Sequence, residues 1–209
     1  TIQNTTSHGV FLSSTQSPSF TTFRIMNTGG SGVRGTGVTH FTCVNGSISG
    51  SNDDGTGAAN ESNIAFHDFA LGTESNLAGN VTITGNSLTT ALFHGIDILN
   101  HSGTVSSLNI SGNTITSATT IAAAQGSGIR LSSLGSASTA SHVLNANITN
   151  NVITNFPNGA GIVVHGGNAN NSGAPSTTMG TAGNGSQVVN ITGNTIAGQS
   201  AANKMNTHA

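Results

Sequence analysis

The residues of this chain best suited to acid–base chemistry are an acidic and a basic side chain at matching places in two similar segments. Asp97 stands in "GIDIL" and Arg130 in "GIRLS", each two residues after a glycine. Residues at matching positions on neighbouring strands lie about 5 Å apart. The pair therefore fits a catalytic face, with Arg130 or the similarly placed Arg34 as the base.

An ion pair without a catalytic role is the alternative for these residues. Hydrolysis of glycosides usually uses two facing carboxylates, and this set of positions supplies only Asp97. An exposed ion pair between strands contributes about 0.2–1 kcal/mol to stability. On this alternative, replacing Asp97 by Asn or Arg130 by Gln changes the free energy of unfolding by less than about 1 kcal/mol.

Metal binding has one weak candidate, the acidic turn "NDDG" with Asp53 and Asp54, followed by Glu61. Calcium takes about 6–8 oxygen ligands, and the spacing of an EF-hand is absent. An ordinary acidic surface turn is the alternative. His67 and His165 share a repeat position but lie three repeats apart, so we expect solvated or core-edge histidines and no metal centre. No cofactor is expected.

Composition excludes several classes of partner. Only 5% of the residues are charged, with four Lys and Arg and a net charge of −2, which disfavours nucleic acid as a ligand. No apolar run reaches the roughly 20 residues that span a bilayer. The single cysteine, Cys43, excludes an internal disulfide and a zinc knuckle. Trp and Tyr are absent, which weakens the case for a sugar-binding surface.

Internal repeats account for most of the chain. "VNITGNTI" at residues 189–196 has close copies, "LNISGNTI" at 108–115, "ANITNNVI" at 146–153 and "VTITGNSL" at 81–88, and a looser one, "FTCVNGSI", at 41–48. Gly-apolar-x-apolar units start near residues 9, 95, 128 and 161, and two weaker members, "GVRG" and "NIAF", start at 32 and 63, which gives steps of 23, 31, 32, 33 and 33. A nearly constant period of this length is typical of a solenoid.

Alternation of apolar and polar residues within each unit predicts short strands. Each repeat supplies three inward apolar positions, which predicts an all-β solenoid of about six coils with three short strands per coil, forming one segment over residues 1–209. A tight corner follows the second strand. The asparagines that we expect to stack there as a hydrogen-bonded ladder are Asn86, Asn113, Asn151 and Asn194.

Two longer stretches, each of which contains one of the repeats quoted above, carry a resemblance to a known family. "GIDILNHSGTVSSLNISGNTI" and "GVTHFTCVNGSISG" resemble the right-handed parallel β-helix repeats of the pectate-lyase-like superfamily, and the resemblance covers about residues 8–198. That superfamily includes polysaccharide lyases and hydrolases, phage tailspikes, autotransporter passengers and adhesins. The Ser/Thr/Asn/Gly-rich texture is similar to long bacterial repeat proteins that are secreted or displayed on the surface, which implies an extracellular location.

Three functions fit these observations. The first is a structural segment of an extracellular bacterial surface protein, a stalk, filament or adhesin. Such a segment is a fragment of a longer repeat protein or stacks on copies of itself, with surface glycans or a neighbouring cell surface as further partners. The second is a polysaccharide lyase or hydrolase that uses Asp97 and Arg130. The third is a binding module that uses the loop at residues 165–187. Neither terminal stretch offers a capping helix, so both ends of the stack are expected to be open.

Overall fold

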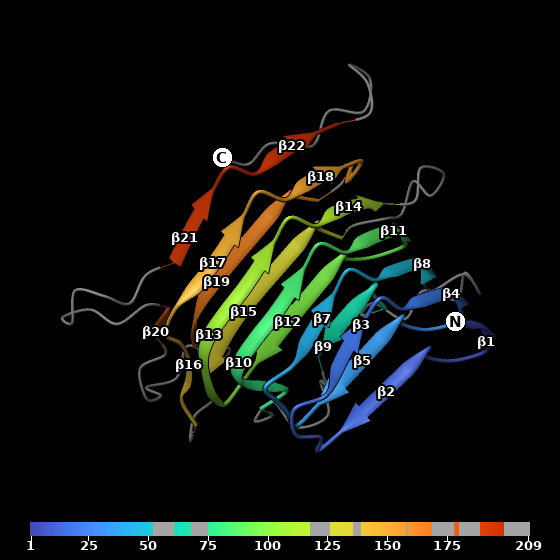
Figure 1. The fold of residues 1–209 in the computed structure, drawn as a ribbon. Helices are drawn as coiled ribbons and strands as arrows, with labels where there is room; N and C mark the ends of the chain where they lie inside the picture. Colours follow the sequence, from blue (N-terminus) through green and yellow to red (C-terminus); the bar gives the residue numbers. More distant parts are fainter. Residues whose placement is uncertain are drawn as a thin grey trace.

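A computed structural model describes residues 1–51, 61–67, 75–117, 126–135, 139–157, 159–168, 178–179 and 189–198. These residues form only strands and connecting segments, with no helix among them. All strand pairs are parallel, and the strands are arranged in three sheets. The colours in Figure 1 run steadily from one end of the stack to the other, as expected when each repeat pairs with the next.

The three sheets each collect one kind of strand from every repeat. The six-stranded sheet contains β2 (Val10–Ser13), β5 (Val33–Thr36), β9 (Ile64–Phe66), β12 (Ile96–Asn100), β15 (Ile129–Gly135) and β19 (Ile162–Asn168). The nine-stranded sheet contains β3 (Ser19–Thr21), β6 (Val38–Thr39), β7 (Thr42–Val44), β10 (Leu77–Thr84), β13 (Gly103–Ser111), β16 (Ser141–Val143), β17 (Ala146–Thr149), β20 (Thr178–Met179) and β21 (Val189–Thr192). The seven-stranded sheet contains β1 (Ile2–Thr5), β4 (Arg24–Thr28), β8 (Ser47–Ser51), β11 (Ser87–Ala91), β14 (Thr114–Ser117), β18 (Val152–Thr154) and β22 (Thr195–Ala197).

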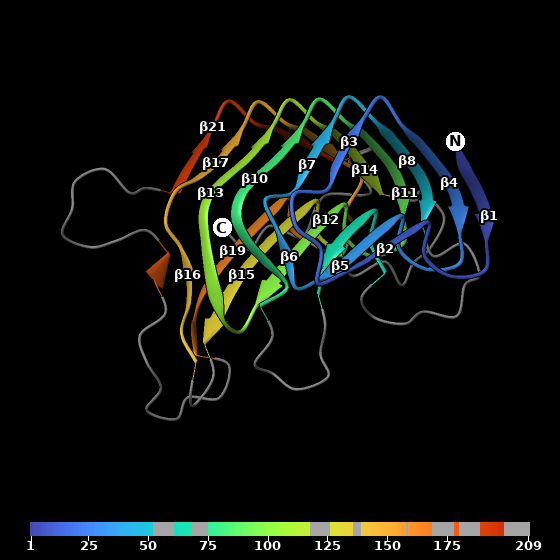
Figure 2. The same ribbon diagram turned by 60° about the horizontal axis from the view of Figure 1, so that its bottom comes forward.

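The chain visits the three sheets in turn and then returns to the first one, which makes the described part a parallel β-solenoid. We call the segment from one strand of the six-stranded sheet to the next a coil. Figure 2 shows the sheets as three sides around a common interior.

The strand register follows the apolar alternation of the sequence. A slip by one residue would turn every apolar side chain outward, so the apolar pattern fixes the register. Three apolar columns run along the stack. The first contains Val10, Val33, Ile64, Ile96, Ile129 and Ile162. The second contains Phe20, Cys43, Ile83, Ile110, Ile148 and Ile191, and the third contains Ile2, Ile25, Ile48, Leu88, Ile115, Ile153 and Ile196.

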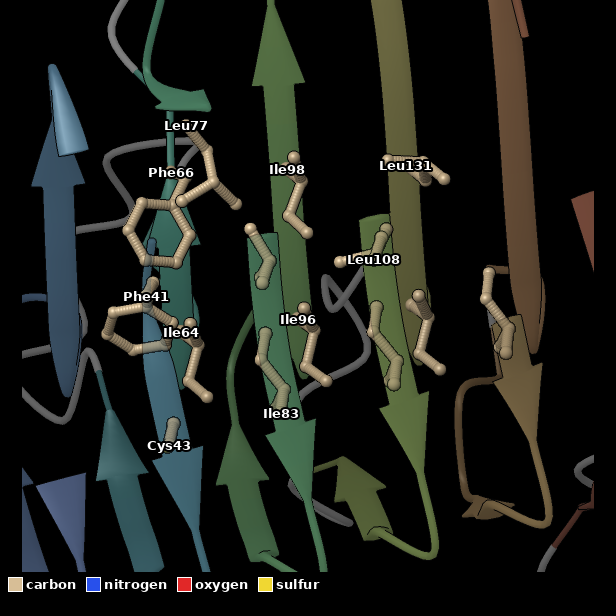
Figure 3. Close-up of a cluster of buried hydrophobic side chains, with 14 of the residues drawn as sticks. Phe41, Cys43, Ile64, Phe66, Leu77, Ile83, Ile96, Ile98, Leu108 and Leu131 are labelled. Carbon is tan, nitrogen blue, oxygen red and sulfur yellow. The ribbon is translucent and has the colours of Figure 1, made fainter. Parts of the chain in front are cut away.

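Aromatic rings fill the interior of the N-terminal coils. The rings of Phe41 and Phe66 pack edge to face with centroids 4.8 Å apart, and Figure 3 shows them beside Leu77. Gly35 makes this packing possible, because a Cβ at Gly35 would stand only 2.6 Å from the ring of Phe66. Cys43 lies in the same core, where burial raises the pKa of its thiol to about 12. Its role is therefore that of a small apolar residue.

The isoleucines of the third apolar column explain why most coils start with glycine. A Cβ on Gly95 would collide with the branched methyl of Ile115, and four other coil-starting glycines face an isoleucine in the same way, namely Gly9, Gly32, Gly128 and Gly161. The exception is the coil that starts with Asn63. Its third-column residue is Leu88, which carries no methyl on Cβ and leaves space for the asparagine side chain. A glycine at the coil start and an isoleucine in the third column thus occur together in five coils.

Candidate functional site

The residues singled out for acid–base chemistry do meet, but in a different environment from the one expected. Asp97 and Arg130 are directly paired on β12 and β15. The guanidinium donates from Nε to Oδ1 and from Nη2 to Oδ2 of Asp97, both at 2.7 Å. The Asp97 side chain is 0% exposed, whereas that of Arg130 is 24% exposed. The expectation of an exposed ion pair is therefore wrong. All five residues of β12 are buried, so both faces of the sheet are covered at this strand.

His67 joins this ion pair from the preceding coil. Its Nδ1 lies 2.8 Å from Oδ2 of Asp97 and 2.8 Å from Nη2 of Arg130. Nδ1 can donate to Asp97 in one tautomer or accept from Arg130 in the other, because it lies at the same distance from a carboxylate oxygen and from a guanidinium nitrogen. The His67 side chain is 0% exposed and neither solvated nor at the core edge. We call Asp97, Arg130 and His67 the Asp97 cluster.

The pKa shifts in the Asp97 cluster favour one charge arrangement. Burial alone would raise the pKa of Asp97, but hydrogen bonds from His67 and Arg130 outweigh it and lower the pKa to about 2. Burial lowers the pKa of His67 despite the opposing effect of Asp97. At neutral pH the cluster thus consists of a carboxylate, a guanidinium and a neutral imidazole, and its charges cancel.

A second polar column lies beside the cluster at the start of the coils. His94 is buried, and its Nδ1 accepts the backbone N–H of Ser127 at 2.7 Å. Ser31 donates to His8 Nδ1 in the same way. The hydroxyls of Ser31, Ser62 and Ser127 accept the backbone N–H one coil further on. Sequence reasoning missed this column. Its signal was the His or Ser that directly precedes the coil-starting residue in the first five coils, in "HG", "SG" and "SN".

Burial is the main cause that lowers the pKa of His94, to about 4, and the charge of Arg130 adds to the effect while Asp97 opposes it. His94 is therefore neutral at pH 7. With Nδ1 acting as an acceptor, its proton is on Nε2, which has no hydrogen-bond partner among the described residues.

The asparagine ladder occupies the corner between the nine-stranded and seven-stranded sheets. Oδ1 of each asparagine accepts both the backbone N–H and an Nδ2 hydrogen of the asparagine one coil earlier, at 2.9–3.0 Å, from Asn86 through Asn113 and Asn151 to Asn194. The other Nδ2 hydrogen reaches a strand carbonyl of the coil before, for example Ile83 O from Asn113 at 2.9 Å. The residue before each asparagine has a positive φ, as at Gly112 (63°) and Asn150 (56°). This conformation makes the corner tight.

The remaining sequence candidates are largely outside the described residues. Asp53 and Asp54 fall there, as does most of the loop at 165–187, of which only residues 165–168 and 178–179 are described. Glu61 is described and partly buried. Within the described part of the chain, no group of three His, Cys, Asp or Glu side chains is placed to hold a metal ion.

Comparisons with known proteins place no name on the site. No protein-family model matches the chain, and neither a curated protein nor a solved structure gives a significant match. The parallel sheets are compatible with the β-helix that the resemblance implies, but no match names the pectate-lyase-like superfamily. Among the described residues there is no helix long and apolar enough to cross a membrane.

Proposed function

We propose that this chain is a structural repeat segment of an extracellular bacterial surface protein, a right-handed parallel β-helix of six coils whose end coils stack on further coils. The observation that carries the proposal is the exposure of two isoleucine side chains in the last described coil. Ile191 is 46% exposed and Ile196 is 48% exposed, whereas Ile148 and Ile153 directly beneath them are 0% exposed. Within the described part of the chain, the last coil thus exposes isoleucines at positions that the coils beneath it bury.

The Asp97 cluster is compatible with such a structural role. A polymeric substrate needs a carboxylate or imidazole that it can touch, and the side chains of Asp97 and His67 are both 0% exposed. In the proposed segment the cluster ties three successive coils together. A stalk or filament needs this kind of cohesion from coil to coil and needs no reacting group.

Sedimentation of the purified chain tests the proposal. We expect concentration-dependent association of the native chain, because buried apolar area contributes about 25 cal/mol per Å². Replacing Ile191 and Ile196 by Asp should give a monomer. The matched control replaces Val152, which is 42% exposed on the inner strand β18, by Asp and should leave the association unchanged. A native chain that remains monomeric at high concentration would contradict the proposal.

A polysaccharide lyase or hydrolase is the second candidate, and the 2.7 Å contacts between Asp97 and Arg130 favour it. In such an enzyme Arg130, whose side chain is 24% exposed, would meet the substrate as the base, held in place by Asp97. Cleavage of an acidic polysaccharide by the native chain, abolished in a folded Asp97→Asn variant, would establish this function in place of the first one.

A further inference from the structure

The two ends of the asparagine ladder are chemically different, and the difference concerns which coil can stack on each end. At every inner step of the ladder, the backbone N–H and one Nδ2 hydrogen of an asparagine meet Oδ1 of the asparagine in the next coil. Asn194 supplies its own Oδ1 to Asn151 and its Nδ2 to Ile148 O. Its backbone N–H and its second Nδ2 hydrogen have no acceptor among the described residues.

The N-terminal end of the ladder is closed. Oδ1 of Asn86 accepts the backbone N–H of Gly46 at 2.8 Å, and Gly46 carries no side chain to continue the ladder. A Cβ on Gly46 would collide with the ring of Phe23, which occupies the equivalent position in the coil before. The two N-terminal coils thus offer a ring and a glycine where the ladder would need a side-chain oxygen.

We infer that the C-terminal edge of the stack is a binding site for a parallel coil that carries Asn at the ladder position and Ile two residues later, and that a coil with Phe or Gly at the ladder position, like the two N-terminal coils, does not satisfy it. The inference rests on the proposed stacking of coils and adds the identity of the partner coil. Two features of the edge argue for this occupant. The backbone N–H and the second Nδ2 hydrogen of Asn194 require one side-chain oxygen in the added coil. This oxygen would take the position relative to Asn194 that Asn194 Oδ1 takes relative to Asn151. The exposed Ile191 and Ile196, on the last strands β21 and β22, require apolar residues in line with them, as in the coils below.

The selectivity follows from the cost of unpaired donors. A coil with Phe or Gly at the ladder position would cover the two N–H groups of Asn194 without accepting them. A buried donor that loses its partner is unfavourable, whereas an Asn oxygen accepts both donors with the geometry already present three times in the ladder. The isoleucines supply contact area, and the asparagine decides which coil fits.

An added coil tests the inference in the full chain. A second copy of residues 117–157 is inserted after Ala197, in register with β22, so that the copy of Asn151 follows Asn194. Two matched chains carry Ala or Gly at that copied position. Hydrogen exchange at the Asn194 backbone amide is then measured by NMR. With Asn in the added coil we expect protection at least about tenfold greater than with Ala or Gly, which is the consequence of one retained hydrogen bond.

The outcomes separate the two proposals. Equal protection by the Asn, Ala and Gly copies would overturn the selectivity and leave coil stacking intact. No protection by any copy would overturn stacking as well. An Asn194 amide that is already as protected as the Asn151 amide in the unextended chain, at a concentration where that chain is monomeric, would also overturn the inference, because the edge would then be satisfied without an Asn-bearing coil.

Discussion

The asparagine ladder and the Asp97 cluster bury polar groups in the same stack of coils by opposite means. In the ladder, identical amides satisfy one another, and each asparagine needs only another asparagine one coil away. In the cluster, three unlike side chains from three coils meet once, and each depends on the other two. Removing one asparagine from the ladder should therefore leave only neutral groups unpaired. Removing Asp97 or Arg130 from the cluster should leave the opposite charge unbalanced.

The largest expected effect is that of Asp97→Ala. The substitution leaves Arg130 and the fully buried His67 without their carboxylate, and breaking a buried ion pair on one side typically costs about 3–5 kcal/mol. Urea unfolding of the native and variant chains measures the difference. The variant Asp97→Ala with Arg130→Met should recover part of the loss, because it removes the orphaned charge. A loss below about 1 kcal/mol would mean that the pair behaves as an exposed one after all.

The next largest effect is that of Asn113→Ala, with Asn194→Ala as its matched control. Asn113 donates from Nδ2 to Ile83 O and to Asn151, and it accepts from Asn86. Removing it leaves several buried groups unpaired, for a loss of about 2–3 kcal/mol. Asn194 is only partly buried and should cost about half as much. Equal losses in urea unfolding would show that burial does not decide how much a ladder asparagine contributes to stability.

Repetition explains which parts of this architecture can be predicted from the sequence. The apolar columns recur in each coil, and a wrong register would conflict with the pattern several times over. The ladder positions recur as well, and the described asparagines do lie in successive coils. The burial of Asp97 could not be obtained in this way. Alternation indicates which side of a strand faces the interior, but it does not say that the other side is covered too, as it is at β12.

His67 shows the same limit of periodic reasoning. Its repeat position is occupied by Leu99 and Ser132 in the next two coils, so comparison along its column gives no sign of a partner. Its partner Asp97 lies in the next coil, two residues before the residue that matches His67, a diagonal relation that only coordinates supply. Residues that occur once are therefore the ones that sequence periodicity misplaces.

A smaller, pH-dependent effect distinguishes His94 from the serines of its own column. The pKa of His94 in the folded state is about 4, below the ordinary value of 6.5. The unfolded chain therefore binds more protons between these values, and stability falls as the pH decreases through that window. We expect a loss of about 1–2 kcal/mol between pH 7 and pH 5. His67 and His8, whose pKa values are also lowered, act in the same direction, while Asp97 and Arg130 remain charged.

The variant His94→Ser is the control for this pH dependence. Ser62 and Ser127 already accept backbone N–H groups at the equivalent position, so a serine at residue 94 keeps an acceptor and removes the titrating group. Urea unfolding across pH 5–7 should give a shallower slope for the variant, whatever its stability at pH 7. An unchanged slope would assign the pH dependence to the Asp97 cluster or to His8.

The smallest effect tests whether the residue at the start of a coil and the third-column residue of the same coil depend on each other. Leu88→Ile restores a branched methyl in the one coil that starts with Asn63 instead of Gly, and overpacking of this kind typically costs about 1–3 kcal/mol, here nearer 1 because the site is at a strand end. Asn63→Gly alone also destabilises, because it removes the hydrogen bonds from Asn63 Nδ2 to Ser51 Oγ and to Thr89 O. In the double variant the methyl again faces a glycine, as in Gly95 and Ile115. The two losses should therefore fall short of additivity by about 0.5–1 kcal/mol in a double-mutant cycle. Strict additivity would mean that the glycine and the isoleucine recur in the coils for separate reasons, without the mutual dependence that links neighbouring asparagines in the ladder.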